Sequence, residues 1–169
     1  MLGIYVDLEN ELIEIEREVD MLARGGELYE QHTQDGDDSA FRWLAIQGLA
    51  SGAEKIYTGC ERVMAKIASD IDGARIDHGE GWHASLLRRM ANPFPGIRGA
   101  VISEESLKGL DQLRAFRHRE RNTYGLSLDP EIVTERAVET EAIFARFRTE
   151  ISAFIKKMND PKPDGGCQA

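Results

Sequence analysis

The chain has 169 residues, of which 41% are hydrophobic, and a formal net charge of -9 at pH 7. This length suits one domain with its own core, so we expect a single domain over residues 1–160 and a flexible tail over 161–169. The net negative charge argues against electrostatic binding of nucleic acid over a broad surface, so any contact with a nucleic acid has to be local. No stretch approaches the roughly 20 apolar residues of a membrane span. The N-terminus also lacks the features of a signal peptide, so we expect a cytoplasmic protein.

Hydrophobic spacing predicts two long helices in the first half of the chain. Aliphatic residues step by four and three positions over residues 8–22, and we expect this helix to end at Gly25-Gly26. A second helical pattern runs from about 41 to 71, and either Asp38 or Ser39 can cap its N-terminus. Both patterns leave one apolar side that requires a partner helix.

The second half predicts one short and two long helices. The short helix covers 82–91 and is stopped by a Pro-rich turn. A helix capped by Ser103 is expected to end at Gly125, and the last helix begins at Pro130 with Asp129 as its cap. No convincing strand is predicted. The sequence therefore predicts an all-α fold, an up-and-down bundle of four long helices plus one shorter helix.

The most unusual segment is basic and lies within this acidic chain. Residues 114–121 contain four arginines and one histidine, and an apolar stripe over 110–116 anchors the other side of the same helix. Arg117 and Arg121 are four residues apart and share one helix surface. Their guanidinium forks could clamp a phosphate together with Arg114. From the residues alone, the segment is either such an anion site or a surface helix whose arginines pair with acids of the same chain.

Three further side chains near this segment carry different chemistry. His118 titrates near neutral pH and could move a proton. Asn122 could orient a hydroxyl or a phosphate, but it cannot act as an acid or a base. Tyr124 follows two residues later, and we expect its hydroxyl near the same edge of the site.

Metal chemistry is not expected. Asp77, His78 and His83 carry ligand-type side chains, but their spacing crosses a Gly-rich loop and matches no tight site. For His83 we expect a structural role as a cap or a hydrogen-bonding group. We expect neither a metal nor a cofactor.

The basic segment resembles the HEPN superfamily, and specifically its HepT-like branch. That signature is an Arg followed after four to six residues by His, with a polar residue after the Arg and, in the HepT form, a Tyr two positions beyond the His. Arg117 matches the arginine, His118 the polar residue and Tyr124 the tyrosine, whereas Asn122 stands where the histidine is expected. The flanking strings are also similar, and the resemblance covers roughly residues 5–158.

The resemblance implies a function. It implies a helical bundle that forms a homodimer with two facing copies of the motif, and that acts as the toxin of a toxin–antitoxin pair. The toxin would be a metal-independent endoribonuclease in which the 2′-hydroxyl of RNA attacks the adjacent phosphate. The antitoxin would be a nucleotidyltransferase that attaches AMP to Tyr124. Because Asn122 cannot take a proton, His118 is the expected base, beside Arg117 and Arg121. The alternative is a domain that binds RNA, a nucleotide or a protein partner without catalysis.

Overall fold

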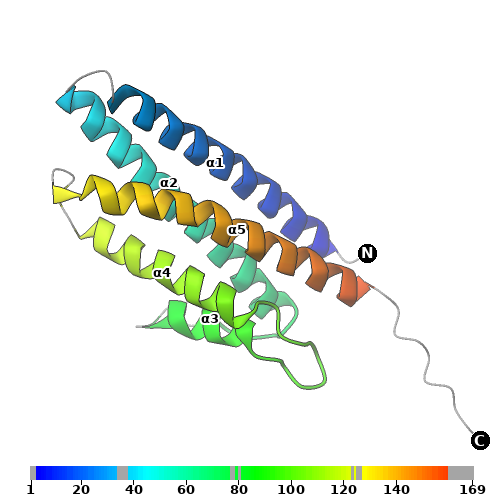
Figure 1. Ribbon diagram of the computed structural model, residues 1–169. Coiled ribbons are helices and arrows are strands. Elements are labelled where there is room, and N and C mark those ends of the chain that lie inside the picture. The colour runs from blue at the N-terminus through cyan, green and yellow to red at the C-terminus, as the bar shows by residue number, and fades with distance from the viewer. Residues whose placement is uncertain are drawn as a thin grey trace, which may run out of the picture.

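The computed structural model describes residues 3–33, 38–76, 79, 81–122, 124 and 127–159. These residues form five α-helices and no β-strand (Figure 1). The helices are α1 (Gly3–Thr33), α2 (Ser39–Asp70), α3 (Trp82–Ala91), α4 (Glu104–Arg121) and α5 (Pro130–Asn159). The predicted all-α class, with four long helices and one shorter helix, is confirmed. Within this described part, no helix combines the length and the apolarity that crossing a membrane requires.

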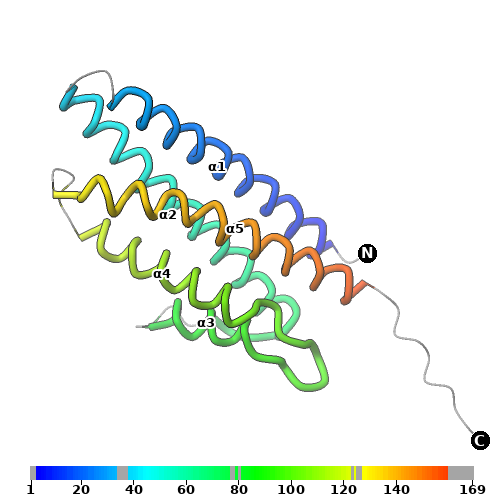
Figure 2. Tube along the Cα trace, in the orientation of Figure 1, coloured from blue at the N-terminus to red at the C-terminus, as the bar shows by residue number. Residues whose placement is uncertain are grey.

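The four long helices alternate in direction around one core (Figure 2). α2 contacts every other helix, whereas α1 contacts only α2 and α5 among the described residues. The short helix α3 lies on the outside, against α2 and α4. α2, α3 and α4 therefore meet on the side of the bundle that α1 does not cover.

The helices form where apolar stripes and capping residues agree. The stripe of α1 is buried, as its spacing predicted, and Leu8 and Leu12 are fully buried. Asp38, rather than Ser39, caps α2, since its side chain accepts hydrogen bonds from the backbone N–H groups of residues 40 and 41 at 3.0 and 3.1 Å. Ser103 caps α4 in the same way. The largest fully buried side chains of the common core are Tyr57, Phe147, Leu8, Leu12, Ile56, Met64, Ile67, Leu87, Met90, Leu110, Leu113 and Ile151.

Two predicted helix ends differ from the structure. α1 does not end at Gly25-Gly26 but continues to Thr33. A helical glycine costs only about 1 kcal/mol relative to alanine, and Tyr29 beyond it packs against the core, so tertiary packing outweighs the local signal. α4 ends at Arg121, four residues before the expected end, because the Asn122 side chain caps it by donating to the carbonyl of His118 at 2.6 Å. Gly125 and the predicted tail over 161–169 lie outside the described residues.

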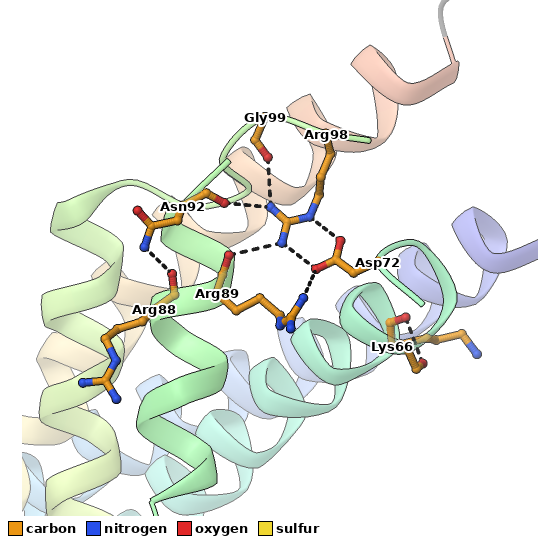
Figure 3. Close-up of polar contacts among 8 residues, drawn as sticks. Lys66, Asp72, Arg88, Arg89, Asn92, Arg98 and Gly99 are labelled. Atoms are coloured by element: carbon orange, nitrogen blue, oxygen red, sulfur yellow. Dashed lines mark hydrogen bonds and ion pairs between the residues drawn. The ribbon is translucent and has the colours of Figure 1, made fainter. Parts of the chain in front are cut away.

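A buried ion pair fixes the connection between α3 and α4 (Figure 3). Asp72, just after α2, accepts two hydrogen bonds from Arg98, at 2.6 and 2.7 Å, and neither side chain is exposed to solvent (0%). The other three donors of Arg98 reach the carbonyls of Arg89, Asn92 and Gly99 at 3.0–3.1 Å, so that all five guanidinium N–H groups are satisfied. This anchor ties the end of α2 to the end of α3 and to the segment that leads into α4.

Candidate functional site

A small pocket lies where α3 and α4 meet. Its volume is about 120 Å³, and it is lined by His83, Arg114, Arg117, His118 and Arg121. It suits a group the size of a phosphate and is too small to enclose a nucleotide. Guanidinium and imidazole groups donate hydrogen bonds, so the lining matches an anion.

α2 holds Arg117 in place from beneath the pocket. Nε of Arg117 lies 3.4 Å from Oε1 of Glu54, and Nη1 lies 3.5 Å from Oε2 of Glu61. Its guanidinium carbon lies 5.8 Å from the centre of the Tyr57 ring, within the range of a cation–π contact. The Arg117 side chain is only 16% exposed. Arg117 is therefore positioned before any ligand arrives, by two long ion pairs and an aromatic ring.

The other two arginines are paired at the surface. Nε of Arg121 lies 2.9 Å from Oε1 of Glu54, although the Arg121 side chain remains 61% exposed. Nε of Arg114 lies 2.7 Å from Oδ1 of Asp111, one turn earlier on α4. Exposed ion pairs of this kind contribute about 0–1 kcal/mol. An incoming phosphate can therefore compete with these carboxylates for both arginines.

Acidic groups behind the arginines interact with one another. Burial and, second, the adjacent Glu54 carboxylate raise the pKa of Glu120 above its usual range. Burial, followed by the negative charge of Glu61, also raises the pKa of Tyr57 well above that of a free tyrosine. A raised pKa at Glu120 favours the neutral form of that carboxyl group.

A histidine and a buried glutamate form a second polar contact at the pocket. Nδ1 of His83, on α3, is hydrogen-bonded to Oε1 of Glu61, on α2. Because an ionised carboxylate can only accept, Nδ1 carries a proton and Nε2 is the ring nitrogen left for other partners. The ring of Trp82 lies 4.0 Å from the His83 ring, centre to centre. The hydrogen-bonding role predicted for His83 is confirmed, and Glu61 joins His83 to Arg117.

A comparison of the sequence with known protein families gives a match that includes the residues of this pocket. A family model described as "HepT-like protein" matches residues 48–158, about two thirds of the chain. The chain belongs to the HepT-like family. The HepT-like match begins within α2, so that α1 lies outside it although α1 packs in the same bundle. Searches of curated proteins and of solved structures give no match.

The structure brings together four of the six residues predicted for the HepT-like site. Arg114, Arg117, His118 and Arg121 line one pocket. The other two do not line it: Asn122 is occupied as the cap of α4, and Tyr124 is 89% exposed.

Asp77 and His78, for which the sequence predicts no metal role, lie outside the described residues. Across the part of the chain that is described, no group of three or more His, Cys, Asp or Glu side chains is arranged to hold a metal ion.

Sequence reasoning missed the acidic partners of the site. Glu54 and Glu61 are single glutamates within a long helix, and nothing near them in sequence identifies Arg117 as their partner. One signal was available: Glu54, Tyr57 and Glu61 recur at helical spacing on one side of α2. A charged residue next to a buried stripe requires a partner, and the basic helix was the obvious source.

Proposed function

We propose that this HepT-like protein is a cytoplasmic toxin that cleaves RNA as a metal-independent endoribonuclease. The observation that carries this proposal is the phosphate-sized pocket in which Arg117, Arg121 and His118 face one space. In the proposed reaction, the 2′-hydroxyl of RNA attacks the adjacent phosphate. Arg117 and Arg121 stabilise the charge that develops on the phosphate oxygens, and His118 accepts the 2′-hydroxyl proton.

The position of Asn122 supports the assignment of His118 as the base. The Asn122 side chain donates to the carbonyl of His118 and closes the helix, and an amide has no proton-transfer role at neutral pH. We expect His118→Ala to abolish RNA cleavage while the fold and the oligomeric state are retained. His32→Ala, at an exposed histidine near the end of α1, is the matched control and keeps full activity. Unchanged cleavage by the His118→Ala variant would contradict this assignment.

We further propose that a nucleotidyltransferase antitoxin neutralises the toxin by attaching AMP to Tyr124. The exposure of Tyr124, at 89%, leaves its hydroxyl accessible to another enzyme. AMP at this position adds bulk and negative charge two residues beyond the cap of α4, and that charge would compete with RNA for the arginines. Intact-mass analysis after co-expression with a candidate nucleotidyltransferase tests this idea. The mass increase should disappear in the Tyr124→Phe variant.

We also propose that the active form is a homodimer. The pocket of one chain is too small to enclose a nucleotide, so a second copy facing it would complete a groove for RNA. Light scattering coupled to size-exclusion chromatography is expected to give twice the mass of 18.9 kDa. A monomeric mass in an active sample would contradict this proposal.

The alternative function is binding of RNA, a nucleotide or a protein partner without cleavage. The ion pairs of Arg117 and Arg121 with acids of α2, and the use of Asn122 as a cap, favour this alternative. Gel-shift and cleavage assays on the same RNA separate the two functions. Binding that depends on Arg117, with the RNA left intact, would support the alternative.

A further inference from the structure

We infer that His83, held by Glu61, is the general acid that protonates the leaving 5′-oxygen during RNA transphosphorylation. This inference rests on the proposed ribonuclease function. It assigns a catalytic role to a residue outside the basic helix, on α3, in addition to the proton acceptor His118 on α4.

The first argument is position. His83 and His118 line the same phosphate-sized pocket as Arg114, Arg117 and Arg121. Transphosphorylation moves two protons, one from the attacking hydroxyl and one to the departing oxygen. A site with two imidazoles can therefore serve both transfers, and three arginines remain to stabilise the phosphate.

The second argument is the partner of each imidazole. Nδ1 of His83 is bonded to the buried carboxylate of Glu61, and a carboxylate in this position fixes the orientation of the ring. With Nδ1 engaged by Glu61, Nε2 is the ring nitrogen left to donate a proton to the leaving group. His118 is exposed, and among the described residues no carboxylate forms an ion pair with it. The acid role therefore falls to His83 and the base role to His118.

The step balances without any further reactant. The 2′-oxygen forms a bond to phosphorus as its proton passes to neutral His118. The bond between phosphorus and the 5′-oxygen breaks as Nε2 of His83 gives its proton to that oxygen. The products are a 2′,3′-cyclic phosphate and a 5′-hydroxyl end. Solvent then returns the two histidines to their starting protonation states.

Glu61 acts in this step as a positioning residue. It contacts His83 through Oε1 and Arg117 through Oε2, so one carboxylate sets the place of both the proton donor and a phosphate-binding cation. Loss of Arg117 placement would weaken the cleavage of every phosphodiester substrate. Loss of His83 placement would weaken only those reactions that require protonation of the leaving group.

A change of leaving group tests the assignment. The substrates are RNA oligonucleotides and a mixture of the four ribonucleoside 3′-(4-nitrophenyl phosphates), whose nitrophenolate departs without a proton. General acid catalysis contributes about 10²–10⁴-fold. We therefore expect His83→Ala to lower RNA cleavage by about 10²–10⁴-fold and cleavage of the nitrophenyl esters by less than about tenfold. His83→Gln, which keeps a group able to bond Glu61, should behave in the same way, and His32→Ala is the control.

The outcomes separate this inference from the proposed function. Suppose that the wild-type protein cleaves both substrates. If His83→Ala then lowers the cleavage of RNA and of the nitrophenyl esters equally, or lowers neither, His83 is not the acid and the ribonuclease proposal stands. If the wild-type protein cleaves neither, both proposals fail. Glu61→Gln is expected to reduce RNA cleavage more than ester cleavage. Equal losses on the two substrates would overturn its role in holding His83.

Discussion

Replacement of Arg98 by methionine should destabilise the protein strongly, because Arg98 anchors the connection between the two helices that carry the site. The substitution keeps a long apolar side chain but removes all five hydrogen bonds. The buried Asp72 carboxylate is then left with one partner, Arg89, at 3.2 Å, whose side chain is 40% exposed. Three backbone carbonyls also lose their donor.

The expected loss follows from the burial of the pair. Breaking a fully buried ion pair by removing one partner costs about 3–5 kcal/mol, and the half-exposed Arg89 compensates only part of the charge left on Asp72. In a domain of this size, 1 kcal/mol corresponds to about 2–4 °C in Tm, so the Tm should fall by roughly 10 °C. Removing the buried charge as well, in the double variant Asp72→Leu with Arg98→Met, should restore part of the loss.

Urea unfolding followed by far-UV circular dichroism measures this free energy, and the midpoint should fall while the m value stays constant. Arg88→Met is the matched control, because Arg88 is an exposed arginine on α3, next to the anchor in sequence, whose side chain points away from the anchor (Figure 3). Its free energy of unfolding should change by less than about 0.5 kcal/mol. A loss below about 1 kcal/mol for Arg98→Met would refute the assignment of the anchor.

Three further predictions concern the stability and reactivity of the bundle. Burial raises the pKa of Glu120, so ionised Glu120 opposes folding at neutral pH; Glu120→Gln should raise the free energy of unfolding at pH 7 by less than about 1 kcal/mol. This gain should vanish below the ordinary pKa of 4.5, where the glutamate is protonated in both states. Gly59→Ala should lower the free energy of unfolding by about 1–2 kcal/mol, because the new Cβ would lie 2.6 Å from Cγ1 of Ile15. Gly48→Ala, in open space on the same helix, should raise the free energy of unfolding by up to about 1 kcal/mol. Thermal unfolding of the two variants compares these effects. Burial raises the pKa of the Cys60 thiol, so its alkylation by iodoacetamide should be slow in the native protein and fast in urea.

The helices were predictable because their signals are local. Apolar stripes and the caps Asp38, Ser103 and Asp129 lie within one or two turns of the elements they define. The reliance on local signals also explains why the end of α1 predicted at Gly25-Gly26 is wrong. The penalty of a helical glycine can be read from the sequence, but the packing of Tyr29 that outweighs it requires a partner helix to be in place.

The site was predictable only on the helix that carries the motif. Arg117, His118 and Arg121 follow from spacing along α4. Glu61 and Arg117 are 56 residues apart in sequence, and Glu61 and His83 are 22 apart, and such contacts depend on how α2, α3 and α4 pack. The buried anchor of Arg98 to Asp72 has the same origin, with a separation of 26 residues. The sequence does not show which charged side chains pair with one another when the partners are far apart along the chain.

The central claim is that Arg117 lies in an RNA-cleaving site, and one assay tests it most directly. Purified protein is incubated with mixed RNAs, with and without EDTA, beside Arg117→Ala and a charge-matched control, Arg119→Ala, on the same helix but outside the pocket. Circular dichroism verifies that both variants are folded. We predict cleavage that survives EDTA, persists in Arg119→Ala and is lost in Arg117→Ala by at least about 10²-fold. Intact RNA after incubation with the wild-type protein, or equal cleavage by Arg117→Ala, would contradict the claim.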